Sequence, residues 1–314
     1  MTAPNTLGWR LTLPVIAAPM FLVSGPELVI GAMRAGIVGT FPALNQRSTE
    51  GYVEWVREIR AATADLPPEQ AIFGVNLIVH PSNTRLEADV RATMDLKVPL
   101  VITSLGAVKL VVDAVHSYGG KVFHDITNRR HAEKAIEAGV DGLILVTAGA
   151  GGHAGTANPF ALVAEIRRIY DGPIALAGAL SNGAQVAAAL AAGADFAYMG
   201  TRFIATKESR AMPGYREMIH ASQIRDIVYT PAISGIPANF MAGSLVKAGL
   251  DPKNLPAVDP KTHKIDMGQE ARAWRDVWSA GHGVVDTKDN PTVAELIGRM
   301  RREFEAARQR LSGV

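Results

Sequence analysis

A histidine flanked by glycine and alanine is the residue of this chain best placed to do chemistry on a bound ligand. It is His153, in the run Val146-Thr147-Ala148-Gly149-Ala150-Gly151-Gly152-His153-Ala154-Gly155. Residues without bulky side chains leave room for a large flat molecule to lie against the backbone. An imidazole titrates near neutral pH, which suits proton abstraction or the stabilisation of a developing anion. The run predicts a cofactor site with Gly151 and Gly152 at the ligand and His153 as the catalytic base.

Three further polar side chains stand near the ends of apolar runs. Asn76 lies in the apolar segment 73–77. An amide there either satisfies neighbouring backbone groups or binds a ligand, and its donor and acceptor atoms match the ring edge of a planar cofactor. We favour the ligand. His124 and Asp125 end the segment 121–125, where cofactor contact and a structural role remain equally open.

Two small-residue turns could hold a phosphate. They are Ala177-Gly178-Ala179 and Gly200-Thr201, each directly after an apolar run. Backbone N–H groups at such turns bind anions, and many barrels place a phosphate after their seventh and eighth strands. Either turn alone is equally compatible with a simple tight connection. Because both occur at these two positions, the phosphate interpretation is the better one.

Short apolar runs alternate with amphipathic stretches along the first two thirds of the chain. We expect strands at Val15–Ala18, Ile37–Phe41, Ile72–Leu77, Leu100–Ser104, Lys121–Asp125, Gly142–Thr147, Ile174–Ala177 and Phe196–Met199. Helices are expected at Glu50–Ala61, Leu86–Leu96, Ala107–His116, Arg130–Ala138, Pro159–Ile166 and Gly183–Ala191. About eight strand–helix units predict an α/β fold, a closed (β/α)8 TIM barrel. An open doubly wound sheet is the alternative, but the first turn, 18–21, lacks its glycine fingerprint.

The regular alternation stops after residue 206. We expect the barrel and its cofactor site in 1–206, a helical or irregular cap over the active-site face in 207–289, and a C-terminal helix that packs back on the barrel in 290–314. The helix itself should span Val293 to Leu311. Ser234, in the segment 234–237, is expected to close over the substrate.

Composition narrows the classes of protein that the chain could be. Hydrophobic residues make up 48% and charged residues 20% of the 314 residues, which suits a folded enzyme rather than a disordered chain. The net charge of +2 with scattered basic residues predicts no nucleic-acid partner. No cysteine is present, so disulfides and cysteine nucleophiles are excluded. We also expect no metal site, no membrane segment and a cytoplasmic location.

The motifs together resemble the nitronate monooxygenase family, formerly called 2-nitropropane dioxygenases. The resemblance runs through most of the chain and rests on Ala17-Ala18-Pro19-Met20, Gly74-Val75-Asn76-Leu77, Gly152-His153-Ala154-Gly155, Ala177-Gly178-Ala179, Gly193-Ala194-Asp195 and Met199-Gly200-Thr201-Arg202-Phe203. Trp278-Ser279-Ala280-Gly281-His282-Gly283 is similar to the substrate-side loop of that family. The family implies an FMN enzyme on a (β/α) barrel.

The resemblance also implies roles for individual residues. FMN and its phosphate would contact Met20, Asn76, Gly178, Ala179, Gly200 and Thr201, and His153 would be the catalytic imidazole. From their positions at or after the strand ends, we also expect cofactor contacts from Ala18, Pro19, His124, Asp125, Gly151, Gly152 and Ala177. Ser234 and His282 would lie on the substrate side. The chain departs from the family at Asp125, where some relatives carry lysine, and at His282, where glutamine is expected.

The implied reaction is the oxidation of alkyl nitronates, or of neutral nitroalkanes, by O2 to carbonyl compounds and nitrite. An NAD(P)H:quinone reductase or an enoyl-thioester reductase on the same flavin barrel is the alternative. A binding protein with a vestigial flavin and a phosphosugar barrel without flavin explain fewer of the motifs. The expected partners are a small-molecule substrate and O2, and the chain could form a homodimer.

Overall fold

Eight parallel strands close into a barrel in the computed structural model, which describes residues 7–106, 109–258, 275 and 277–313. The strands follow in the order β1 (Val15–Ala17), β2 (Val38–Pro42), β3 (Phe73–Ile78), β4 (Leu100–Ser104), β5 (Lys121–Ile126), β6 (Gly142–Val146), β8 (Ile174–Ala177) and β9 (Phe196–Met199). β9 pairs with β1, so the barrel has no free edge. The predicted TIM barrel is confirmed, with each strand end within one residue of its expected place.

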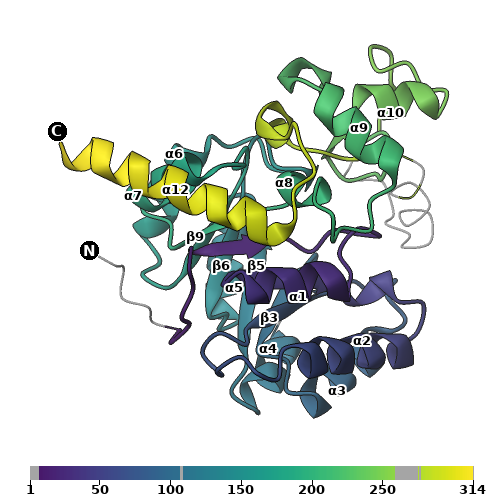
Figure 1. The fold of residues 1–314 in the computed structure, drawn as a ribbon. Coiled ribbons are helices and arrows are strands. Elements are labelled where there is room, and N and C mark those ends of the chain that lie inside the picture. The colour runs from purple at the N-terminus through teal and green to yellow at the C-terminus, as the bar shows by residue number, and fades with distance from the viewer. Residues whose placement is uncertain (1–6, 107–108, 259–274, 276, 314) are drawn as a thin grey trace.

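Helices cover the outside of the barrel and connect the strands (Figure 1). They are α1 (Pro26–Arg34), α2 (Thr49–Ala62), α3 (Leu86–Asp95), α4 (Lys109–His116), α5 (Arg129–Glu137), α6 (Pro159–Arg167), α7 (Gly183–Ala191) and the short α8 (Thr201–Ile204). Helices α2, α6 and α7 begin after capping side chains: Ser48, Asn158 and Asn182 each accept a backbone N–H of the first turn. Helix α1 was not among the expected helices, and residues 107 and 108 of the expected fourth helix lie outside the described residues.

Aromatic side chains close the lower end of the barrel, where the strands begin. The ring of Trp9 stacks on Phe123 with 6.0 Å between centroids and lies 5.7 Å from Phe196. All three side chains are buried, together with Ile16 and Ile144 in the barrel interior. The interior is therefore a packed core, and a ligand can approach only at the carboxyl ends of the strands.

The segment after β9 folds over those carboxyl ends. It contains α9 (Pro213–Ala221), β10 (Ile227–Thr230), β11 (Ala238–Met241), α10 (Ala242–Lys247) and the 3-10 turns η2 (Ile224–Asp226) and η3 (His282–Asp286). β10 and β11 form a three-stranded sheet with β7 (Gly152–His153), which belongs to the loop after β6. We call this segment the cap. Besides the expected helices it holds strands, and residues 259–274 and 276 of it lie outside the described residues.

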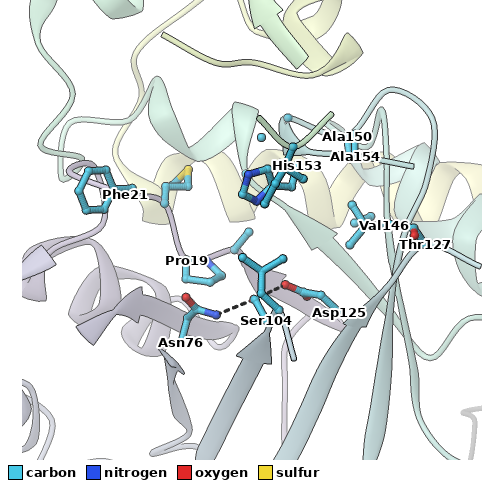
Figure 2. Close-up of a pocket in the computed structure, with 18 of the residues that line it drawn as sticks. Pro19, Phe21, Asn76, Ser104, Asp125, Thr127, Val146, Ala150, His153 and Ala154 are labelled. Atoms are coloured by element: carbon cyan, nitrogen blue, oxygen red, sulfur yellow. Dashed lines mark hydrogen bonds between the residues drawn. The ribbon is translucent and has the colours of Figure 1, made fainter. Parts of the chain in front are cut away.

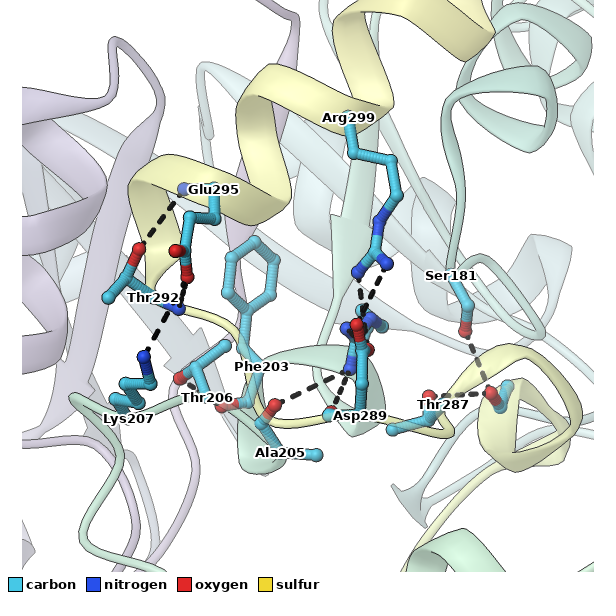
Figure 3. A network of polar contacts seen from close by, with 12 residues as sticks. Ser181, Phe203, Ala205, Thr206, Lys207, Thr287, Asp289, Thr292, Glu295 and Arg299 are labelled. Atoms are coloured by element: carbon cyan, nitrogen blue, oxygen red, sulfur yellow. Dashed lines mark hydrogen bonds and ion pairs between the residues drawn. The ribbon is translucent and has the colours of Figure 1, made fainter.

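Helix α12 (Val293–Ser312) returns along the barrel wall beside α7 (Figure 1). Gly183 allows this close approach, because a Cβ there would lie 1.8 Å from the carbonyl oxygen of Met300. Ahead of the helix, Asp289 joins two arginines. Its Oδ1 accepts from Nη2 of the buried Arg202 at 2.5 Å and its Oδ2 accepts from Nη1 of Arg299 at 2.8 Å (Figure 3). The carboxylate thus ties α12 to α8, directly after the last barrel strand.

Candidate active site

A cavity of about 1560 Å³ lies between the carboxyl ends of the barrel strands and the cap. Pockets for drug-sized ligands measure roughly 300–1,000 Å³, so this cavity has room for a cofactor and a second molecule. Every residue that the sequence placed at the cofactor lines it, together with His153: Ala18, Pro19, Met20, Asn76, His124, Asp125, Gly151, Gly152, Ala177, Gly178, Ala179, Gly200 and Thr201. The fold therefore brings these residues to one place.

A row of polar side chains forms the floor of the cavity (Figure 2). Asn76 is 6% exposed, and its Nδ2 donates to the carbonyl of Ile102 at 3.2 Å and to Ser104 Oγ at 2.9 Å. Ser104 in turn donates to Asp125 Oδ2 at 2.6 Å. Because both amide hydrogens of Asn76 are used, its Oδ1 remains as an acceptor. The row comes from the ends of three successive strands, β3, β4 and β5.

Asp125 is a carboxyl group in an unfavourable place for a charge. Burial raises its pKa to about 6, although the Ser104 hydrogen bond and the charge of His153 act in the opposite direction. Within the described chain, its Oδ1 is buried and accepts no hydrogen bond. The floor of the cavity can therefore hold a proton at Asp125 in mildly acidic solution.

His153 lies across the cavity from this row (Figure 2). It is the second residue of β7 and pairs with Ala238 of β11, so its backbone belongs to the sheet of the cap. Its side chain is half-buried and lies on the ligand side of the loop, near enough to Asp125 to interact with it electrostatically. A flat ligand on the floor would thus have an imidazole above one face. This strand pairing was not predicted from the sequence.

The two predicted phosphate turns differ in how they are built. Gly178 has φ +141°, and a Cβ there would lie 2.2 Å from Thr147 Oγ1, so the turn itself requires glycine. Ala179 follows with φ +57°, a strained conformation of the kind that gathers at ligand sites. Gly200 has an ordinary φ of −105°, and the nearest atoms to a Cβ, in Ala18 and Met20, are 3.7 Å away. Packing against protein atoms therefore does not require glycine at position 200. A ligand bound in the space beside it would require glycine there.

His124 lies on the other face of β5 from Asp125, as alternation along a strand demands. Its Nδ1 is 2.8 Å from Thr103 Oγ1, and burial lowers its pKa to about 4. The imidazole is therefore neutral at physiological pH. It is among the residues that line the cavity, and its hydrogen bond goes to Thr103 and not to the row formed by Asn76, Ser104 and Asp125.

The two residues predicted on the substrate side do not line the cavity. Ser234 is buried and donates its hydroxyl to the carbonyl of Ile236 at 3.0 Å. The backbone N–H of His282 binds the carbonyl of Gly149 at 2.9 Å. Their neighbours in the same segments line the cavity instead: Ile236, Pro237, Ser279, Ala280 and Gly283. In irregular chain, the sequence shows which segment approaches a ligand but not which side chains point to it.

Tyr198 and Tyr215 also line the cavity and were not predicted. Burial raises the pKa of both phenols above the ordinary value, so both stay neutral. Tyr198 lies on β9, two residues before Gly200, and alternation from the buried Phe196 could have placed it inside the barrel. Tyr215, on α9, carries no such signal.

Two features are absent from the described residues, 7–106, 109–258, 275 and 277–313. No group of three or more histidine, aspartate or glutamate side chains is arranged there to hold a metal ion. Among the helices of the same part of the chain, none has the length and apolar character needed to cross a bilayer.

Comparisons with known proteins agree with the sequence motifs. The pattern of the nitronate monooxygenase family matches residues 82–303. A nitronate monooxygenase of Paraburkholderia phytofirmans is 28% identical over 95% of this chain and 94% of its own length.

Solved structures support the same fold. FabK from Thermotoga maritima is 26% identical, with a TM-score of 0.78 over 96% of both chains. A nitroalkane oxidase from Streptomyces ansochromogenes has a TM-score of 0.80 at 24% identity, covering 96% of this chain and 98% of its own. At that identity, the second structure supports the barrel and cap alone.

Proposed function

The chain belongs to the nitronate monooxygenase family, and on that premise we propose that it is an FMN enzyme that oxidises alkyl nitronates with O2. Its products would be carbonyl compounds and nitrite. Membership of the family makes the protein a flavin-dependent oxidoreductase. The observation that carries the finer proposal is the placement of His153 on one side of the cavity and of the Asn76–Ser104–Asp125 row on the other.

The residues present fit a flavin mononucleotide. The cavity is larger than one ligand needs, and its floor offers an amide oxygen and a carboxyl group to a polar ring edge. The open space beside Gly200 and the strained turn at Ala179 fit a phosphate held by backbone N–H groups. When bound, the flavin supplies the electron-transfer chemistry, which protein side chains alone do not provide.

Side chains of this chain would place the substrate and handle its proton. Asn76 and Asp125 would hold the flavin from the floor of the cavity, on the side opposite His153. The imidazole would hold the oxygen atoms of a nitronate, or remove a proton from a neutral nitroalkane. Apolar residues of the cap side, Ile236 and Pro237 among them, would exclude water from the substrate.

Replacing His153 with alanine tests its role directly. We expect His153→Ala to retain FMN, because the floor and the turns are untouched, and to lose turnover by roughly 10²-fold or more, the range of general acid–base catalysis. Steady-state turnover of propyl nitronate, with bound FMN measured by absorbance, provides the check. Unchanged turnover would refute a catalytic role for His153.

Anaerobic stopped-flow spectroscopy distinguishes the proposed nitronate oxidation from an NAD(P)H-dependent reductase activity. The yellow protein is mixed in separate experiments with propyl nitronate, NADH and NADPH. We expect the visible flavin absorbance to change rapidly with the nitronate and to stay constant with either nucleotide. Rapid bleaching by a nucleotide alone would mean that the protein is a reductase.

A reductase fed by NAD(P)H is the second candidate, and the size of the cavity favours it. A small nitronate leaves much of the roughly 1560 Å³ unfilled once a flavin is present. The exposed cations Arg47 and Lys109 are among the residues that line it, and a cation is a binding partner for a nucleotide phosphate. We rank it second because the family pattern that matches residues 82–303 is that of the nitronate monooxygenases.

A further inference from the structure

The loop that carries His153 is positioned by the cap as well as by the barrel. Strand β7 consists of Gly152 and His153 only, and it pairs antiparallel with β11, with Gly152 opposite Asn239. So short a strand has little stability of its own. The direction of the imidazole therefore depends on the contacts between this loop and the cap.

A serine hydroxyl of the cap lies between the two paired residues. Ser279 Oγ accepts a hydrogen bond from the backbone N–H of Gly152 at 2.7 Å and donates one to the carbonyl of Asn239 at 2.6 Å. Ser279 is 9% exposed, so water cannot readily replace either bond. One oxygen atom thus links the backbone beside His153 to β11.

Further contacts fix the serine and its partner from the cap side. Asn239 is 4% exposed, and its Nδ2 donates to the carbonyl of Ala150 at 2.7 Å. The hydroxyl of Tyr215 donates to the carbonyl of Ser279 at 2.5 Å, and its ring stacks on Trp278 with 5.1 Å between centroids. The backbone of Ser279 is therefore held from behind while its hydroxyl reaches the catalytic loop.

We propose that Ser279 is a positioning residue for His153. Its hydroxyl fixes the position of the Gly152 backbone. Because His153 follows Gly152 directly, the same hydrogen bond also positions the His153 imidazole relative to a ligand in the cavity. The inference rests on the proposed catalytic role of His153. It gives the cap a part in the reaction beyond covering the cavity.

Substitution of Ser279 by alanine is the first test. It leaves the N–H of Gly152 and the carbonyl of Asn239 without their common partner. Since a misplacement of about 1 Å can cost about 10²-fold in rate, we expect Ser279→Ala to lower kcat by roughly 10- to 100-fold and to change KM and FMN affinity by less than about twofold. A kcat within about twofold of the wild-type value would overturn the proposal.

Ser244 offers a matched control in the same cap. It is 1% exposed, and its Oγ accepts the backbone N–H of Trp278 at 2.7 Å. None of the hydrogen bonds described for it within residues 7–258 and 277–313 reaches β7. We expect Ser244→Ala to keep the wild-type kcat. An equal loss of kcat in both variants would mean that general weakening of the cap is responsible, and would overturn the proposal.

Two measurements separate positioning from catalysis. In the protein without FMN, hydrogen exchange of the Gly152 amide, followed by NMR, should speed up in Ser279→Ala and not in Ser244→Ala. In a double-mutant cycle, Ser279→Ala should cost nothing further in the His153→Ala background, because it acts through that side chain. Unchanged exchange, or additive losses, would overturn the proposal. Full turnover in His153→Ala itself would instead remove the proposed function on which this inference rests.

Discussion

Asp125 shows how much of the site depends on the protonation of single side chains. Its carboxyl group lies on the floor of the cavity, accepts one hydrogen bond from Ser104, and has its pKa raised by burial to about 6. The ionised form is therefore destabilised in the folded protein relative to the unfolded chain. A residue of this kind costs stability near neutral pH, a cost that functional sites commonly carry.

The pH dependence of stability follows from this shift. Below the ordinary pKa of 3.8 the carboxyl is protonated in both states, and above about 6 it is ionised in both. Between these values the folded state binds more protons, so stability falls as the pH rises. In the protein without FMN, we expect the free energy of unfolding of Asp125→Asn to increase relative to that of the wild type as the pH rises through this window, by at most about 3 kcal/mol. Urea titrations at a series of pH values measure the difference, and a constant difference would contradict it.

Residue patterns in the sequence located the cavity residues at the strand ends better than those contributed by the cap. Asn76 and Asp125 lie near the carboxyl ends of buried strands and Gly200 directly follows one, and the geometry of a barrel places such positions at one rim. Ser234 and His282 lie in irregular chain, where no periodicity sets the direction of a side chain. The structure consequently brings only their segments to the cavity.

At the scale of elements, the sequence predicted those strands that are marked by a local apolar pattern. The barrel strands are short apolar runs between polar turns, and their observed ends differ from the expected ones by a residue at most. Strand β7 was not predictable in this way, because its two residues pair with Ala238 and Asn239, far along the chain. Pairing over such a distance leaves no periodic signal.

The connection of α12 to the barrel gives a prediction at this scale. Arg202 is 1% exposed, and Asp289 is its partner. Asp289→Asn removes the charged hydrogen-bond partner of a buried guanidinium, so we expect a loss of about 2 kcal/mol in the free energy of unfolding at neutral pH. Chemical denaturation monitored by circular dichroism measures the loss.

A control and a pH series sharpen this test. The exposed pair of Arg34 and Asp65 has the same chemistry at 3.0 Å. Because water screens an exposed pair, Asp65→Asn should lower the free energy of unfolding far less than Asp289→Asn does. The hydrogen bond from Arg299, together with Arg202, holds the pKa of Asp289 below its usual value. Its contribution is therefore present above pH 3.8, the ordinary value, and is lost as the pH falls through the lower folded value. Equal losses in both variants would contradict the account.

At the scale of the whole molecule, the cofactor is expected to stabilise the fold that surrounds it. A ligand present at about 100 times its Kd adds about 2.7 kcal/mol to the free energy of unfolding. Because the turns at Ala179 and Gly200 fit a phosphate, FMN should raise the Tm more than riboflavin, which has no phosphate. Thermal unfolding with each compound measures the difference.

Gly200→Ala is the matched variant for this comparison. Its Cβ would lie 3.7 Å from the nearest protein atoms, so the protein without ligand should keep its Tm. The advantage of FMN over riboflavin should shrink. Equal stabilisation of the wild type by both compounds would contradict a phosphate site at these turns.

The sheet formed by β7, β10 and β11 has a consequence for engineering the family. A chimera that exchanges caps between relatives would separate Ser279 and Asn239 from the Ala150–His153 segment that they hold. We expect such a chimera to bind its new substrate and still react slowly, because the His153 imidazole would be misplaced relative to the substrate. The unit that can be transplanted is therefore the cap together with the loop after β6, two pieces of chain that no single crossover point delivers.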